Sequence, residues 1–121
     1  MPLPVTIADD STLSRKLIAR SLPEEWKLSI THATNGWEAL EAWHAGKADL
    51  LLLDLNMPEM DGFQVMETLR TEGKHAVIIV VSADIQPKAR ERACALGAMA
   101  FVKKPIDSFQ LNSILKDCGL L

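Results

Sequence analysis

The stretch 49–62, "DLLLLDLNMPEMDG", places four consecutive leucines directly before an acidic residue, Asp54. An unbroken apolar run of this length is typical of a strand that is covered on both faces, as interior strands of parallel sheets are. Pro58 follows four residues later and predicts a turn. A single acid after a strand is usually a turn residue or a helix cap. It can also be a reactive carboxylate held rigidly at the end of the strand.

Outward from this run, segments of strand and helix character alternate along the chain. Short apolar stretches predict strands at 4–8, 27–33, 49–55, 76–83 and 98–104. Apolar residues at helical spacing predict helices within 13–22, 35–46, 61–73, 87–97 and 109–115. On the second helix, Trp37 and Trp43 are expected to face the sheet. Strict alternation of this kind favours right-handed crossovers and one α/β domain, a parallel sheet with helices on both faces.

Composition excludes several classes of function. The chain has 121 residues, with 13 Lys and Arg against 16 Asp and Glu, and a formal net charge of −3. This length suits one domain, and the mild acidity without a basic cluster disfavours direct binding of nucleic acid. No apolar run approaches the roughly 20 residues of a membrane helix, and no basic segment precedes an apolar one at the amino terminus. With two separated cysteines and no signal peptide, we expect a soluble, cytoplasmic protein with no membrane contact.

Polar residues fall at the predicted carboxyl ends of four strands, where ligands bind in open parallel sheets. They are Asp9 and Asp10 after the first strand, Asp54 after the third, Ser82 at the fourth, and Lys103, Lys104 and Pro105 at the fifth. The three carboxylates would meet at one edge of the sheet, where they repel one another and raise each other's pKa unless a cation compensates them. Mg²⁺ is the usual cation for such oxygen ligands. Together with the amino termini of the following helices, this set suits a phosphoryl group, with Asp54 as nucleophile.

Four segments carry a specific resemblance. The chain reads "ADDS" at 8–11, "DLNMPEMDG" at 54–62, "VVSA" at 80–83 and "FVKKP" at 101–105. In order, spacing and total length it resembles the response-regulator receiver domain of two-component signalling over essentially all of residues 1–121, and single-domain chemotaxis-type regulators have the closest layout. The resemblance implies a flavodoxin-like, doubly wound fold with a five-stranded parallel sheet in the order 2-1-3-4-5 and five helices.

The resemblance also implies a role for each matched residue. Asp54 is the phospho-acceptor, Lys104 contacts the phosphoryl group, and Ser82 bonds a phosphoryl oxygen after activation. Mg²⁺ is held directly by Asp10 and through water by Asp9. The full implied metal site comprises Asp9, Asp10, Asp54 and the backbone carbonyl of Asn56.

Further positions concern switching and signal lifetime. Phe101 matches the aromatic switch position, and because it lacks the hydroxyl of tyrosine its switching must rest on packing. Asn56 and Asp84 match two positions that influence attack by water on the phospho-acceptor, which implies a phosphorylated state that is not unusually long-lived. Both can equally be plain exposed loop residues. The bond between Lys104 and Pro105 is commonly cis in the family.

The implied activity is a switch rather than an enzyme. A sensor histidine kinase or a phosphotransfer protein passes a phosphoryl group to Asp54, and the surface of the fourth helix, fifth strand and fifth helix then signals to a downstream target or an attached output domain. The sequence does not settle whether the chain stands alone or belongs to a longer protein. It also leaves open the kinase, the target, the pathway and the oligomeric state.

Two other functions compete with the switch. An aspartate-nucleophile phosphatase on a related fold needs a second acid two residues after the nucleophile, and Asn56 at that position argues against it. A pseudo-receiver that acts only as an interaction module is disfavoured by the intact set of matched residues, namely Asp9, Asp10, Asp54, Ser82 and Lys104.

Overall fold

The computed structural model describes residues 2–73, 77–83 and 86–119. Within them, five parallel strands form one sheet in the order β2-β1-β3-β4-β5. The strands are β1 (Leu3–Ala8), β2 (Leu28–Ala33), β3 (Leu50–Leu53), β4 (Val77–Ser82) and β5 (Ala100–Lys103). The helices are α1 (Thr12–Ser21), α2 (Gly36–His44), α3 (Gly62–Thr71), α4 (Pro87–Ala95) and α5 (Ser108–Asp117). The predicted α/β fold, strand order and helix number are confirmed.

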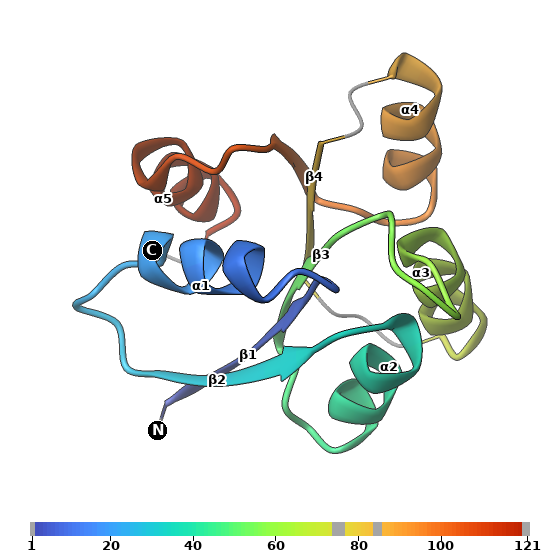
Figure 1. Ribbon diagram of the computed structural model, residues 1–121, viewed down its shortest axis with the longest axis horizontal. Coiled ribbons are helices and arrows are strands. Elements are labelled where there is room, and N and C mark those ends of the chain that lie inside the picture. The colour runs from blue at the N-terminus through green and yellow to red at the C-terminus, as the bar shows by residue number, and fades with distance from the viewer. Residues whose placement is uncertain (1, 74–76, 84–85, 120–121) are drawn as a thin grey trace.

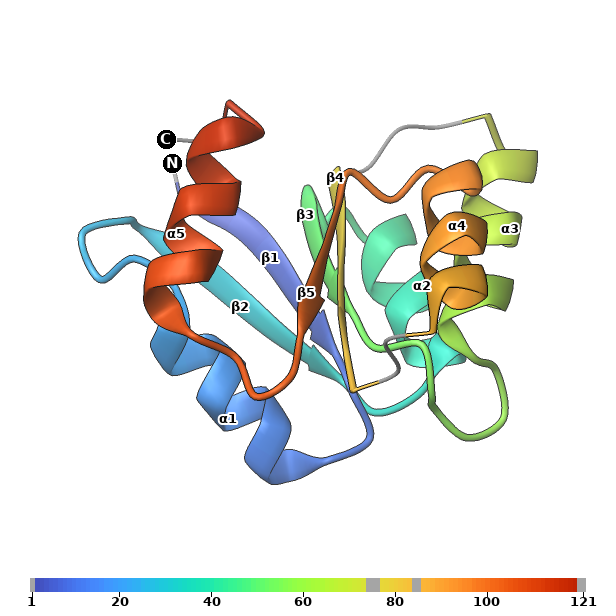
Figure 2. The same cartoon turned by 90° about the horizontal axis from the view of Figure 1, so that it is seen from above.

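The helices cover both faces of the sheet, with α1 and α5 on one face and α2, α3 and α4 on the other (Figures 1 and 2). The four leucines of β3 supply both layers because successive side chains of a strand point to opposite faces. Leu50 and Leu52 belong to the apolar cluster on the α1 and α5 face. Leu51 and Leu53 belong to the cluster on the other face, and all four leucines are fully buried. β3 is therefore the centre of the core.

Side-chain caps fix where the helices begin after the strands. Ser11, Asn35 and Asp61 each accept a backbone N–H from the first turn of α1, α2 and α3, and Asp107 does so at α5. Asp61 forms a full capping box, because its own N–H donates to the side chain of Gln64. Because each helix follows a strand of a parallel sheet, its amino end lies at the same edge of the sheet as the carboxyl ends of the strands.

The expectation that both tryptophans of α2 face the sheet is half wrong. Trp43 packs against the apolar cluster, whereas Trp37 is 58% exposed. At 3.6 residues per turn, a spacing of six residues separates two side chains by about 120° around the helix. The two rings therefore cannot share one face, and Leu40, which lies about 60° around the helix from each of them, is buried.

Candidate functional site

Two acidic residues leave neighbouring strands at the centre of the carboxyl edge. β1 and β3 pair in register up to Ala8 and Leu53, and the N–H of Asp54 donates to the carbonyl of Ala8 at 2.9 Å. Asp9 and Asp54 therefore emerge side by side from two paired strands whose carboxyl ends are buried. β1 pairs with β2 on one side and with β3 on the other, so the strands that follow β1 in the sequence lie on both sides of it. The strand order therefore reverses between β1 and β3.

Asp10 joins these two acids to form an oxygen-rich cluster. Each of Asp9, Asp10 and Asp54 offers a carboxylate oxygen, and these atoms all lie within 4.8 Å of one another. Asp9 and Asp54 are buried and Asp10 is exposed. Carboxylate oxygens are hard ligands that suit a divalent cation such as Mg²⁺. The donor set present thus fits the metal that the sequence predicts.

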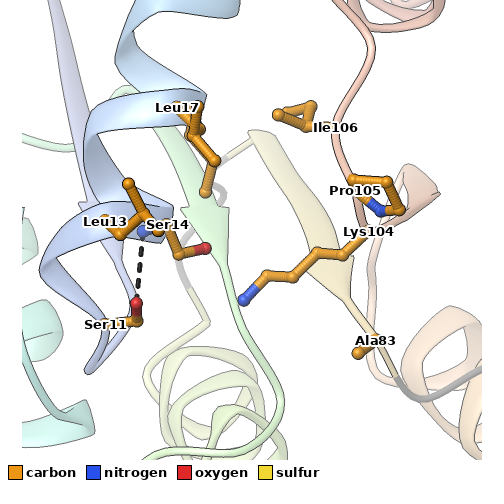
Figure 3. A pocket seen from close by; sticks show the side chains of 9 residues that line it. Ser11, Leu13, Ser14, Leu17, Ala83, Lys104, Pro105 and Ile106 are labelled. Carbon is orange, nitrogen blue, oxygen red and sulfur yellow. Dashed lines mark hydrogen bonds between the residues drawn. The ribbon is translucent and has the colours of Figure 1, made fainter.

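Lys104 supplies a positive charge to the same cluster. Its Nζ lies 2.6 Å from Oδ2 of Asp9 and 3.3 Å from Oδ2 of Asp54. The backbone holds it in place, since its N–H donates to the carbonyl of Ser82 at 2.9 Å and the peptide bond to Pro105 is cis, as expected. Figure 3 shows its side chain extending from the Pro105 side toward the first turn of α1. Lys103, by contrast, is exposed.

The pKa values show that the lysine does not fully compensate the acids. Burial raises the pKa of Asp54 above its ordinary value and the charge of Asp9 adds to this, while Lys104 and the N–H of Asn56 oppose the rise without cancelling it. For Lys104, burial lowers the pKa, but the hydrogen bond to Asp9 and the charge of Asp54 outweigh burial and leave it raised. Lys104 lies closer to Asp9, so Asp54 is the carboxylate that a further cation would stabilise most.

Backbone and side-chain donors orient the two buried acids. Oδ1 of Asp9 accepts the N–H of Ser11 at 2.9 Å, and the carbonyl of Asp9 accepts a hydrogen bond from Arg15 at 2.7 Å. Oδ1 of Asp54 accepts the N–H of Asn56 at 3.3 Å. Arg15 was not identified from the sequence. The one feature that could have indicated it is its position, one helical turn after the cap residue Ser11.

The remaining predicted residues belong to β4, β5 and the segment after β4. Ser82 is fully buried at the carboxyl end of β4, where it pairs in register with Lys103. Phe101 lies on β5, partly buried against the apolar cluster of the α2, α3 and α4 face. The guanidinium of Arg90 on α4 lies 5.3 Å from the centroid of its ring, a contact that the sequence did not reveal. Asp84 falls outside the described residues.

An apolar groove of about 460 Å³ opens beside Lys104 (Figure 3). Its walls are formed by α1 and by the segment that follows β5, with Leu13 and Leu17 facing Pro105 and Ile106. Leu13 is 68% exposed and Leu17 is 42% exposed, although both fit the helical pattern of core residues. In the part of the chain that the structure describes, no helix has both the length and the apolarity to cross a membrane.

Comparison with known proteins agrees with this geometry. The model of the response regulator receiver domain family matches residues 5–116. The chain is 36% identical over 105 residues to the transcriptional regulatory protein PdtaR of Mycobacterium tuberculosis, covering 87% of this chain and 51% of that protein. It is 34% identical over 109 residues to protein-glutamate methylesterase/protein-glutamine glutaminase 3 of Rhodospirillum rubrum, covering 89% and 30%. The chain thus spans about a third to a half of the length of these curated relatives.

Solved structures show the same likeness over nearly the whole chain. The signal receiver domain of NarL from Mycobacterium tuberculosis superposes with a TM-score of 0.86 at 30% identity, covering 97% of this chain and 95% of that one. The chemotaxis protein CheY4 of Vibrio cholerae shares the fold with a TM-score of 0.84 at 24% identity, covering 97% and 98%. The chain belongs to the response regulator receiver domain family of two-component systems.

Proposed function

We propose that residues 1–121 form one receiver domain in which Asp54 accepts a phosphoryl group from the phosphohistidine of a sensor histidine kinase or phosphotransfer protein. The observation that carries this proposal is the position of Asp54. It is a buried carboxylate with a raised pKa, at the reversal point of the sheet, with Asp9, Asp10 and Lys104 around it. Phosphorylation replaces the carboxylate with an acyl phosphate that carries more negative charge, and Lys104 together with a bound cation can compensate that charge at this position.

The reaction is proposed to depend on Mg²⁺, held by the carboxylates of Asp9, Asp10 and Asp54 and by the carbonyl of Asn56. When bound, the ion supplies positive charge to the oxygens of the transferring group. The mutual proximity of the three acids supports this assignment, because three carboxylates whose oxygens lie within 4.8 Å of one another carry more negative charge than Lys104 alone can compensate.

In the proposed step, a carboxylate oxygen of Asp54 forms a bond to phosphorus as the bond from phosphorus to the donor's imidazole nitrogen breaks. The imidazole leaves with the electron pair and takes up a proton. Lys104, already 3.3 Å from Asp54, stabilises charge on the phosphoryl oxygens. The apolar groove beside Lys104 leaves this side of the site open to the donor protein.

The consequence is a change of surface rather than turnover of a substrate, so the domain acts as a switch and not as an enzyme. Ser82 would bond a phosphoryl oxygen, and Phe101 would repack into the space this opens. The surface of α4, β5 and α5 would then signal to a downstream target or output domain. Asn56 and Asp84 are proposed to tune the water-driven loss of the phosphoryl group. The cytoplasmic location stays a prediction.

The test is incubation of the chain with a small acyl phosphate and Mg²⁺, followed by intact-mass measurement. We expect one phosphoryl adduct on wild type and none on Asp54→Ala or on wild type with excess chelator. Asp107→Ala is the matched control, since Asp107 is an exposed acid that caps α5 and does not belong to the cluster of Asp9, Asp10 and Asp54; it should be labelled like wild type. An equal adduct on Asp54→Ala would place the acceptor elsewhere and refute the proposal.

A further inference from the structure

The loop between β3 and α3 carries Asn56, and a neighbouring helix holds it in place. The N–H of Gly36, the first residue of α2, donates to the carbonyl of Met60 at 3.0 Å. One residue earlier, Nδ2 of Asn35 donates to Oε2 of Glu59 at 2.9 Å. These two hydrogen bonds join segments that are 24 residues apart in the chain, and Figure 1 shows α2 and α3 side by side on one face of the sheet.

Gly36 is required at this contact because there is no room for a side chain. A Cβ at this position would lie 2.5 Å from both the Cγ and the carbonyl oxygen of Met60. The side chain of Met60 could rotate away, but its carbonyl oxygen belongs to the backbone of the loop and cannot. A larger residue would push the loop away from the helix, and the loop would have to move with its backbone.

The loop contains an unfavourable backbone conformation, which the contacts with α2 help to maintain. Glu59 has a φ of 68°, in the left-handed region that non-glycine residues rarely adopt. The N–H of Met60 donates back to the carbonyl of Pro58 at 2.7 Å, which closes a tight turn. At its far end the loop is fixed again, since the N–H of Gly62 donates to the carbonyl of Leu55 at 3.1 Å. Asn56 lies between these two fixed points.

We propose that Asn35 and Gly36 are positioning residues for the metal site, because they clamp the loop that presents Asn56 beside Asp54. They touch neither the metal nor the phosphoryl group. The inference rests on the proposed function, since it assumes that Asn56 contributes to Mg²⁺ binding. Groups that orient metal ligands typically change metal affinity by ~10-fold or more when they are replaced.

The test is direct titration of Mg²⁺ by calorimetry into folded protein, with stability measured separately in the absence of the metal. Gly36→Ala should weaken Mg²⁺ binding by about tenfold. Gly46→Ala is the matched control: Gly46 follows the other end of α2, has a φ of +75°, and has open space around its Cβ position. This control should lose stability through backbone strain yet bind Mg²⁺ within about twofold of wild type.

A second pair of variants keeps the test valid if Gly36→Ala fails to fold. Asn35→Ser retains a good helix cap and the net charge but cannot reach Glu59, and it should weaken Mg²⁺ binding about threefold. In the double variant Asn35→Asp with Glu59→Gln, the amide of residue 59 donates to the carboxylate of residue 35, and the net charge is unchanged. This variant should bind Mg²⁺ with wild-type affinity. A merely structural role would lower stability in both glycine variants and leave all affinities alike.

The outcomes separate the two proposals. If wild type binds no Mg²⁺, the proposed function fails and the clamp fails with it. If wild type binds Mg²⁺ and Asn35→Ser binds it equally well, only the clamp is overturned. The clamp is also overturned if the exchanged pair binds as weakly as Asn35→Ser, because the hydrogen bond between the two segments would then have no part in the effect.

Discussion

Burial has opposite effects on stability in the middle of β3 and just past its carboxyl end. Leu50 to Leu53 are fully buried among apolar partners from both faces of the sheet, an arrangement that stabilises the fold. The next residue, Asp54, is almost as buried, at 7% exposure, but it carries a charge and shares one lysine with a second buried acid. Burial that stabilises the leucines destabilises the carboxylate.

This contrast shows how the domain combines rigidity with reactivity. The apolar strand fixes the backbone, and the incompletely compensated acid at its tip gains from a cation and from a phosphoryl group. Replacing residues on either side of the boundary between Leu53 and Asp54 should therefore change stability in opposite directions.

The largest effect is expected inside the strand. Leu52→Ala removes a fully buried side chain from the α1 and α5 face, and it should lower the free energy of unfolding by roughly 2–5 kcal/mol. Leu13→Ala makes the same chemical change at a residue that is 68% exposed, and it should change stability by less than about 0.5 kcal/mol. Denaturant unfolding measures both. Similar losses of stability for the two variants would contradict the claim that burial at β3 stabilises the fold.

The second effect concerns the cation at the edge. Lys104→Met leaves Asp9 and Asp54 without their shared partner, and it should destabilise the protein by about 2 kcal/mol near neutral pH. The pKa of Lys104 is raised from 10.5, so wild type holds this stability below pH 10.5 and loses it as the pH rises through the folded-state value. The difference between wild type and variant should therefore shrink in strongly alkaline solution. A difference that grows there would contradict the assignment.

The third and smaller effect has the opposite sign. Asp54→Asn removes the buried charge and should raise the free energy of unfolding at neutral pH by on the order of 1 kcal/mol. The pKa of Asp54 is raised from 3.8 in the folded protein, so the penalty is complete above the folded-state value. It fades as the pH falls through that value and is gone below 3.8, where both states are protonated. Unfolding followed across this range checks the sign, and a variant that is less stable than wild type at neutral pH would refute it.

Much of this arrangement could be predicted from the sequence, because it depends on patterns along the chain. The unbroken leucines indicated an interior strand, and strict alternation of strands and helices placed Asp9, Asp10, Asp54 and Lys104 at one edge. The structure bears out that convergence, while the chemical roles of these residues stay proposals.

The rest depends on geometry that no pattern encodes. The closer approach of Lys104 to Asp9 than to Asp54 is a matter of side-chain position that the order of residues along the chain does not specify. The hydrogen bond from Asn35 to Glu59 joins residues whose own neighbours suggest only a helix cap and a turn. Trp37 lies about 120° around α2 from Trp43, so the expectation that both face the sheet fails for Trp37, which is 58% exposed.

The most direct test of the account compares the unfolding free energies of wild type and Asp54→Asn, each with and without Mg²⁺, at neutral pH. A metal that binds the folded state stabilises it in proportion to its occupancy. The account predicts that Mg²⁺ stabilises wild type strongly, leaves Asp54→Asn nearly unchanged, and so removes the advantage of the variant. Equal stabilisation of both proteins, or of neither, would contradict the claim that the buried carboxylate at the end of β3 is the charge that the metal compensates.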